Sequence, residues 1–403
     1  MQLLSDVKMF FNVKGSTKLV FTLFFYGLAL GILAPMNAIY LSDEVGLSKG
    51  EVAVVFASSL TLKMIFTVTI GIISDKMRKR KRIPLIATIF CITGLLYYMR
   101  ATDFTTALIG MSIATAPSGL IMGQLFAMSR IHYLRLVPTM VEMCQLWLRS
   151  SLSIGFFSGL LVGANLFLVA TFEGVLWGNL VGYVLLLILL LSYKELDEPV
   201  TKVRAATGSG EPFSLTMLIA LLLLASSDSL RGLYLPLVVN ELFGKPELMS
   251  YLWSVQAIFE LLFMTLAGYW AFKYGSKRII LAGSIFAFIV YITYMSSSSI
   301  IIFFIVQPFY SFYVSILLGV AMGYVQRMFI NRTGFGSSLY VLIFDMAALI
   351  GYFTPLLIQG ISQTIFRIPS IFVGIAMILI LKELYVDYMK KRYHKSRIFE
   401  ETV

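Results

Sequence analysis

Long apolar runs separated by short polar loops dominate the pattern of this 403-residue chain. About twelve of these runs are long enough to form a helix of roughly 20 residues, the length that crosses the hydrocarbon core of a bilayer. The pattern therefore predicts an all-α membrane protein. We place the runs at residues 19–41, 51–74, 83–100, 104–128, 139–163, 168–193, 213–238, 248–271, 278–296, 300–326, 337–362 and 367–385.

The longest loop separates the first six runs from the last six. Residues 194–212 contain four acidic residues, two prolines and the sequence Ala-Ala-Thr-Gly-Ser-Gly, which is typical of a flexible cytoplasmic linker. We expect an N-terminal six-helix bundle at 1–193, a C-terminal six-helix bundle at 213–385 and a basic cytoplasmic tail at 386–403.

Composition supports a chain whose outer surface meets lipid. Hydrophobic residues make up 59% and charged residues only 13%, and the mean hydropathy is +0.87. So few charges could not cover a soluble protein of this length. The two cysteines and two histidines argue against a disulfide framework and against a Cys- or His-based metal site. With no Walker loop, dinucleotide motif or nucleophile–base set, we expect no cofactor, no metal and no enzymatic activity.

The excess of positive charge follows the loops. Most of the 32 Lys and Arg residues fall in alternate loops, on the side that also holds both termini. Positive charge marks the cytoplasmic side, so we predict cytoplasmic termini and a multi-pass protein of the plasma or inner membrane. The net charge of +11 thus indicates a lipid bilayer as partner and not nucleic acid.

A short motif repeats at equivalent places in the two predicted halves. The first copy holds Gly71, Asp75, Lys76 and Arg80, and the second holds Gly268, Lys273 and Gly275. The pair resembles the loop signature of the major facilitator superfamily, although Arg78 replaces a glycine and Phe272 replaces the aspartate. The resemblance implies two six-helix bundles that alternate in access to a midplane site. It also implies a gating role for a set of charged and glycine residues: Asp75, Lys76, Arg80, Arg130, Arg149, Lys273 and Gly275.

Further short matches are similar to the sugar efflux transporter branch of that superfamily. They lie along most of the chain: Ala34-Pro35, Tyr40-Leu41-Ser42, Gln124-Leu125-Phe126-Ala127 with Arg130, Arg149, Pro236-Leu237, Glu260 and Gln326. This resemblance implies export of a sugar. The segment from Gly155 to Gly159 lacks the Gly-Pro pair of many efflux antiporters, which leaves the direction of transport open. Its glycines keep the spacing of closely packed membrane helices.

Ionisable residues inside membrane spans are the strongest indication of a site. Trp253, Gln256 and Glu260 share one helix face, where an aromatic ring could stack on a sugar and the polar groups could bind its hydroxyls. A carboxylate there could also carry a proton. The alternative is a structural hydrogen bond to a neighbouring helix.

Two other carboxylates lie within predicted spans. Asp228 is three residues from Arg231, so these two can pair on one helix face, either at a binding site or as a packed structural pair. Asp345 is alone among hydrophobic residues and is a second candidate for proton coupling. Arg149 needs a carboxylate partner, for which Glu142, Asp345 and Asp228 are all open.

Prolines interrupt the first, fourth, seventh and tenth predicted helices at residues 35, 117, 236 and 308. In the superfamily that the chain resembles, these helices line the central cavity. Asn37, Gln124 and Gln307 lie on three of them and are candidates for contacts with sugar hydroxyls.

The sequence favours a monomeric secondary transporter that exports a sugar or sugar-like solute by proton antiport. In this interpretation Glu260 binds proton and substrate in turn. A multidrug exporter is one alternative, since the chain is rich in Phe and Met. A non-transporting membrane scaffold or sensor with the same fold is another.

Overall fold

The computed structural model describes residues 9–74, 80–195, 210–329 and 333–401. These residues are helical with short connections, and no strand occurs among them.

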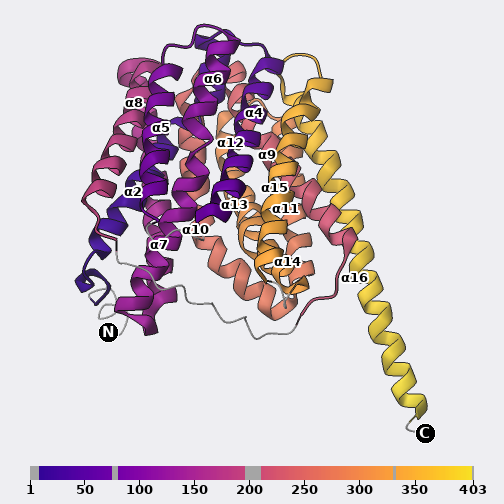
Figure 1. Cartoon of the computed structure of the whole chain (residues 1–403). Coiled ribbons are helices and arrows are strands. Elements are labelled where there is room, and N and C mark those ends of the chain that lie inside the picture. Colours follow the sequence, from indigo (N-terminus) through magenta and orange to yellow (C-terminus); the bar gives the residue numbers. More distant parts are fainter. Residues whose placement is uncertain (1–8, 75–79, 196–209, 330–332, 402–403) are drawn as a thin grey trace. The chain divides into compact units, whose positions relative to one another are not determined.

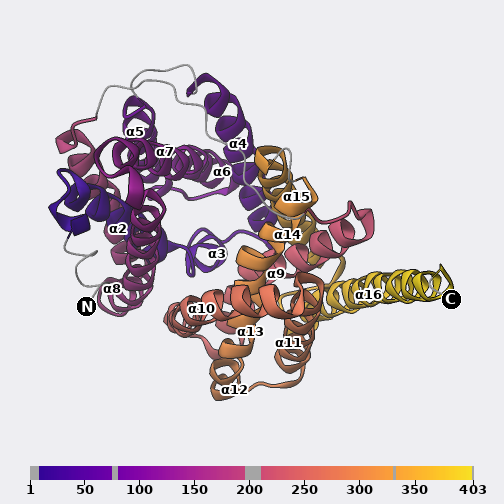
Figure 2. The same ribbon diagram turned by 90° about the horizontal axis from the view of Figure 1, so that it is seen from below.

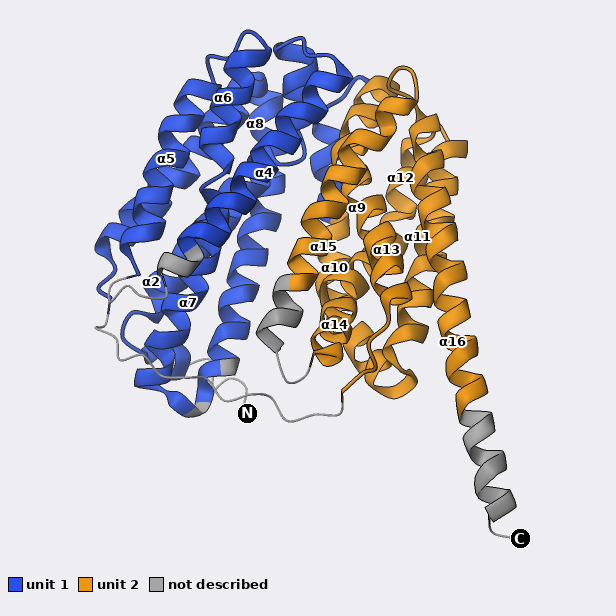
Figure 3. Cartoon of the chain, turned by 45° about the vertical axis from the view of Figure 1, so that its right-hand side comes forward, with its two compact units in different colours: residues 1–202, 244–254 blue, residues 203–243, 255–403 orange. Residues whose placement is uncertain are grey.

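The helices form two compact units, which Figure 3 distinguishes by colour. The first contains Met1–Lys202 together with Gly244–Ser254, and the second contains Val203–Phe243 together with Val255–Val403. The boundaries that we predict for the two halves and the linker stay a prediction.

The helices of the first unit follow one another along the chain from the N-terminus (Figure 1). They are α2 (Ser16–Leu33), α3 (Asn37–Ile39), α4 (Lys49–Ser74), α5 (Arg82–Tyr98), α6 (Phe104–Thr115), α7 (Ser118–Leu136) and α8 (Val141–Ser192), with a π-helical turn at Tyr40–Glu44 and a 3-10 turn at Pro138–Met140. Their core includes Leu23, Cys91 and Leu125, which are fully buried.

The second unit begins with a long helix and ends with another. Its helices are α9 (Leu215–Phe243), α10 (Glu247–Tyr274), α11 (Ser276–Ser296), α12 (Ile300–Ile305), α13 (Gln307–Ser315), α14 (Met322–Met328), α15 (Thr333–Phe353) and α16 (Arg367–Glu401), with a π-helical segment at Ile316–Ala321 and 3-10 turns at Thr354–Leu357 and Gln363–Phe366. The first turns of α10, as far as Ser254, are counted with the first unit. Helix α9 is central to this unit, because it packs against both α15 and α16.

Helix α8 is two membrane spans joined without a loop. Its backbone leaves the helical region at Ala170 and Thr171, where Thr171 has φ 51°. The part before this break packs on α2 with Gly155 beside Phe24, and the part after it returns along the same helix. Figures 1 and 2 both show α8 beside α2.

The described residues confirm the predicted fold class. Ten stretches are long and apolar enough to cross a membrane, and one of them is Met143–Ser192, which contains the break in α8. Helix α5 is a shorter apolar helix. With α5 and the two parts of α8 counted separately, twelve crossing segments result.

Three of the four prolines lie where a helix is interrupted. Helix α2 ends just before Pro35, α6 ends just before Pro117, and α12 gives way to α13 just before Pro308. Pro236 differs, because it lies inside the continuous helix α9. A proline removes one N–H from a helix but need not end it when neighbouring helices hold the backbone in place.

Candidate functional site

A buried polar cluster occupies the second unit, among side chains that are otherwise aromatic and aliphatic. Helix α9 carries Asp228 and Arg231 one turn apart, so that both point to the same side. Arg231 is only 2% exposed. A guanidinium stays charged at any relevant pH, and a buried charge is expensive unless it is fully partnered. Its partners therefore define the site.

Neutral amide oxygens hold the Arg231 guanidinium. Its Nη1 donates to Gln256 Oε1 at 2.9 Å, and its Nη2 donates to Gln307 Oε1 at 2.8 Å. The Gln307 amide is itself fixed, because its Nε2 donates to the Tyr294 hydroxyl at 3.0 Å and to the Phe303 carbonyl at 2.8 Å. The Arg231 Nε has no hydrogen-bond partner among the described residues. One donor of the buried cation is therefore left over.

Tyr310 connects the arginine with the aspartate. The Arg231 Cζ lies 3.7 Å from the centre of the Tyr310 ring, a close cation–π contact. The hydroxyl of the same tyrosine donates to Asp228 Oδ1 at 2.5 Å. In the described structure Asp228 and Arg231 form no direct ion pair, so the pairing allowed by their spacing is replaced by an aromatic bridge. Tyr291 extends the bridge, with its hydroxyl 3.4 Å from that of Tyr310.

Helix α10 brings Gln256 and Glu260 to this cluster. Gln256 binds Arg231 directly, and the half-buried Glu260 lies four residues further along the same helix. Glu260 also lies close enough to Asp228 and Arg231 to interact with their charges. Serine hydroxyls of α13 donate to the carbonyls of Gln256 and Glu260 at 2.9 and 3.1 Å and fasten the two helices together.

Trp253, the third residue predicted on this face of α10, makes a different contribution. It is partly buried, and its indole nitrogen has no hydrogen-bond partner among the described residues. Its role as a stacking surface stays a prediction.

Five predicted site residues thus lie together: Asp228, Arg231, Gln256, Glu260 and Gln307. Sequence reasoning missed the tyrosines that organise them, namely Tyr291, Tyr294 and Tyr310. The spacing of Gln307 and Tyr310, three residues apart on one helix face, was the available signal.

The other polar candidates lie elsewhere. Asn37, in the first unit, accepts a hydrogen bond from the Tyr98 hydroxyl at 2.7 Å and donates to the Met111 sulfur at 3.7 Å. Gln124 is also buried in the first unit, on α7. Asp345 is half-buried on α15 and lies near Tyr352.

The predicted gating residues have varied surroundings. Asp75 and Lys76 lie outside the described residues. Arg130 is half-buried on α7. Arg149 is exposed and lies 5.9 Å from the centre of the Phe126 ring, which is its contact in the described residues in place of a carboxylate.

The remaining gating candidates lie at helix ends. Lys273 is exposed over the Tyr274 ring at 5.2 Å, and Gly275 adopts φ +90° just before α11. The backbone amide of Arg80 donates to Glu195 Oε1 at 2.7 Å, and that of Lys81 donates to Oε2 at 3.1 Å. A carboxylate from the end of α8 therefore caps the start of α5.

The second unit has ionic contacts near the start of α11 that the sequence did not suggest. Lys277 is buried and pairs with Asp387 at 2.7 Å and with Glu383 at 3.3 Å, both on α16. Arg327 donates to the Ser276 hydroxyl at 2.6 Å and lies 3.9 Å from Glu211. Among the described residues, no group of three or more His, Cys, Asp or Glu could hold a metal ion.

Twelve apolar segments among the described residues, in two units, one of which holds a buried charged cluster, define a multi-pass membrane protein. The profile of the Major Facilitator Superfamily matches residues 19–351. The chain belongs to this superfamily.

Characterised relatives point to a branch of the superfamily. The chain is 22% identical over 379 residues to sugar efflux transporter B of Salmonella typhimurium (strain LT2), with 92% of this chain and 94% of the relative covered. It is 21% identical over 323 residues to sugar efflux transporter A of Escherichia coli (strain K12), with 79% and 82% covered. The resemblance to sugar efflux transporters is therefore confirmed.

Solved structures share the fold at lower identity. The nucleoside transporter NupG matches with a TM-score of 0.76 at 12% identity, covering 92% of this chain and 98% of that one. A peptide transporter of the POT family matches with a TM-score of 0.75 at 12% identity, covering 93% and 94%.

Proposed function

We propose that this chain is a proton-coupled secondary transporter that exports a sugar or sugar-like solute by alternating access. The observation that carries the proposal is Arg231, a cation that is buried in an apolar bundle and held by two amide oxygens and an aromatic face. The same amides can exchange these bonds for bonds to sugar hydroxyls at little cost in hydrogen-bond number. The names of the two characterised relatives support the same class of solute.

The composition of the cluster favours a polar solute over an apolar drug. Amide, guanidinium and carboxyl groups converge within it, and an apolar ligand could not replace any of their mutual hydrogen bonds that it displaced. Orientation of a ligand by a few converging polar groups among aromatic rings is typical of specific small-molecule sites.

We assign the coupling proton to Glu260. This carboxyl is half-buried at the edge of the cluster, whereas Asp228 is occupied by the Tyr310 hydroxyl. In this scheme the ionised form of Glu260 captures solute together with Gln256, and protonation releases it. Gating by Asp75 and its neighbours, and sugar contacts from Asn37 and Gln124, are parts of the same proposal.

The test is transport by Glu260→Gln in reconstituted vesicles. A pH gradient should drive uptake of a neutral sugar from a panel of mono- and disaccharides into vesicles holding the unmodified protein. The variant should lose this pH-driven accumulation. Because glutamine resembles the protonated carboxyl, sugar-for-sugar exchange without a gradient should persist only at a higher sugar concentration. Glu241→Gln is the matched control, because Glu241 is exposed at the end of α9. Normal pH-driven accumulation by Glu260→Gln would disprove the assignment of the proton.

The solute class is tested separately with the unmodified protein. The midpoint temperature of thermal denaturation should rise with the concentration of any sugar that is a true ligand. Stabilisation by cationic dyes, with none by any sugar, would favour the multidrug alternative. No flux of any solute, together with tolerance of substitutions at Glu260, Asp228 and Asp345, would favour a scaffold.

A further inference from the structure

One helix of the polar cluster changes its form along its length. Helix α13 (Gln307–Ser315) passes into a π-helical segment (Ile316–Ala321) and then into α14 (Met322–Met328) without a loop. We call residues 316–321 the π segment. A π-helical turn is rare, occurs frequently at functional sites and holds about one residue more than an α-helical turn. The two ends of this helix are therefore out of the register that a continuous α-helix would give them.

The part before the π segment belongs to the polar cluster. The side chain of Gln307 accepts a hydrogen bond from Arg231 at 2.8 Å. Ser315 is the last residue of α13, and its hydroxyl donates to the main-chain carbonyl of Glu260 at 3.1 Å. The π segment thus begins directly beside the helix turn that carries the proposed proton site.

The part after the π segment is fixed to two other places in the second unit. Arg327 donates to the hydroxyl of Ser276, the first residue of α11, at 2.6 Å. Its main-chain carbonyl accepts a bond from the amide of Glu211 at 2.9 Å, and its Nε lies 3.9 Å from the carboxylate of the same residue. The end of α14 is therefore held to α11 and to the chain that leads into α9.

Both sets of contacts exist together only while the π segment keeps its form. If its residues formed an α-helix, α14 would turn by about 100° relative to α13 and move by about 1.5 Å, because that is the step of one residue in an α-helix. Such a movement would break the contacts of Gln307 at one end or those of Arg327 at the other. The helix thus has two arrangements, and the described structure contains the π-helical one.

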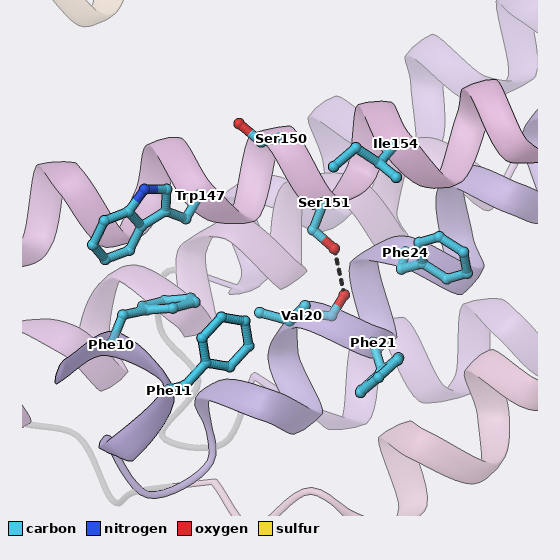
Figure 4. Close-up of a pocket in the computed structure, with 9 residues that line it drawn as sticks. All are labelled: Phe10, Phe11, Val20, Phe21, Phe24, Trp147, Ser150, Ser151 and Ile154. Carbon is cyan, nitrogen blue, oxygen red and sulfur yellow. Dashed lines mark hydrogen bonds between the residues drawn. The ribbon is translucent and has the colours of Figure 1, made fainter. Parts of the chain in front are cut away.

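A hydroxyl from another helix holds the π segment. Tyr340 of α15 is buried, and its hydroxyl donates to the main-chain carbonyl of Leu317. A bond of the same kind fastens two regular helices in the first unit, where the Ser151 hydroxyl donates to the Val20 carbonyl at 2.7 Å (Figure 4). Leu317 differs because it lies in the π segment, so a change to α-helix would turn its carbonyl away from Tyr340. The bond therefore stabilises the π-helical arrangement.

We propose that the π segment converts to α-helix during the transport cycle and so couples the polar cluster to the contacts of Arg327. This conversion is a step of the transport function proposed above, on which it rests. Coupling between two sites requires an element with two arrangements that both sites can bias. Exchange of solute or proton in the cluster changes the bonds of Gln307 and biases the π segment from one end. The bonds of Arg327 bias it from the other end.

Deletion of Leu318 tests whether the change of form is needed. Leu318 is 42% exposed, and without it the segment has the number of residues of a continuous α-helix, so both ends can keep their contacts. The deletion variant should denature at the same temperature as the unmodified protein or at a higher one. Its pH-driven sugar uptake in vesicles should nevertheless fall at least tenfold. Uptake at the unmodified rate would overturn the proposal.

Deletion of Ile285 is the matched control. This residue is 43% exposed on the regular helix α11, where a deletion turns the rest of the helix by about 100° and displaces its buried face. The control should therefore denature at a much lower temperature than the unmodified protein. An equal loss of stability on deletion of Leu318 would mean that the π segment holds no removable residue, and it would also overturn the proposal.

Hydrogen exchange tests the coupling without any transport. Gln307→Leu removes the bond to Arg231 at one end of the helix, and the Glu211 amide, bonded to the Arg327 carbonyl, reports on the other end. The substitution should raise the exchange rate of this amide severalfold in the full-length chain and leave it unchanged in the chain that lacks Leu318. A rise that persists in the shortened chain would show general loosening of the unit and would contradict the coupling.

Tyr340→Phe gives a second measurement with every residue of the helix present. Loss of the bond to Leu317 should favour the α-helical arrangement and raise the exchange rate at Glu211 severalfold. Tyr313→Phe is the control, because its hydroxyl donates to a carbonyl of α9, and it should leave this rate unchanged. An unchanged rate at Glu211 in either Gln307→Leu or Tyr340→Phe would overturn the proposal. Absence of sugar uptake by the unmodified protein would instead disprove the proposed function, and the exchange rates would still decide whether the π segment couples its two ends.

Discussion

Tyr310 offers the sharpest test of how the polar cluster works. Its hydroxyl holds Asp228 while its ring lies against the Arg231 guanidinium, so it separates two opposite charges on neighbouring turns of α9. In Tyr310→Phe the ring remains and the donor is lost. The freed carboxylate should then turn to the guanidinium and draw it away from Gln256 and Gln307. We expect Tyr310→Phe to weaken solute binding even though it removes no group proposed to touch the solute.

The size of the effect follows from the bonds involved. A hydrogen bond to a charged group contributes about 1.5–3 kcal/mol, and its loss leaves the Asp228 carboxylate buried without its donor. If the Arg231 side chain turns to pair with Asp228, its hydrogen bonds to Gln256 and Gln307 are weakened by a similar free energy. Since about 1.4 kcal/mol corresponds to a factor of ten, the Kd for the solute should rise about tenfold or more.

The assay compares Tyr310→Phe with Tyr313→Phe. Tyr313 lies on the same helix and is also buried, but its hydroxyl donates to a main-chain carbonyl, that of Leu224, at 2.6 Å. Both variants lose one buried hydroxyl and should lose some thermal stability, whereas only Tyr310→Phe should raise the Kd of solute binding. The double variant Asp228→Asn, Tyr310→Phe should bind solute better than Tyr310→Phe alone, because an amide cannot form the ion pair. Equal Kd values for the two tyrosine variants, or simple additivity in the double variant, would refute the reasoning.

Three shorter predictions concern packing, capping and the arginine. Gly155→Ala should destabilise the protein by about 1–3 kcal/mol, because its Cβ would meet the Phe24 carbonyl. The control Gly268→Ala has open space around its Cβ and should leave the stability unchanged. Thermal denaturation in detergent measures the stability of both variants. Glu195→Gln should lower the unfolding free energy by about 1 kcal/mol, because it weakens the cap on α5, and a chemical denaturation curve measures this. Arg231→Lys should abolish measurable solute binding in the thermal-shift assay, since a lysine keeps the charge but cannot bridge two amide oxygens with a planar fork; unchanged binding would show that charge alone suffices.

Much of the fold could be predicted because a bilayer allows few solutions. Apolar runs of spanning length become helices, and proline interrupts them unless their surroundings hold the backbone, as at Pro236. The sequence did not predict that the two spans of α8 join without a loop. A non-glycine residue at positive φ, Thr171, makes that reversal, and no turn motif in the sequence marks it.

The residues of the candidate site could be predicted from the sequence, but the contacts between their side chains could not. Ionisable and amide side chains are rare enough in spans that Asp228, Arg231 and Glu260 stand out. Tyrosine is common in such spans, so the spacing of Tyr310 from Gln307 was only a weak signal before the structure placed the Tyr310 hydroxyl on one charge and its ring on the other. Helix spacing alone suggested a direct pair, because spacing gives the neighbours on one helix and not the side chain that another helix inserts between them.

The balance of charge in the cluster also explains why we couple it to protons. Arg231 contributes one positive charge that does not titrate, while Asp228 and Glu260 could contribute two negative charges. Two ionised carboxylates near one buried cation leave an uncompensated charge in an apolar bundle, and such a charge is costly there. Binding one proton restores neutrality, and Glu260 is the carboxyl that is half-buried and not bonded to a tyrosine. A neutral solute can then enter or leave without changing this balance of charge, whereas each proton changes it.

The pH dependence of transport should therefore be lost in Glu260→Gln. Asp228→Asn should alter the affinity for the solute and keep the pH dependence. If transport by Glu260→Gln keeps its pH profile and Asp228→Asn loses it, the two carboxylates have the opposite roles.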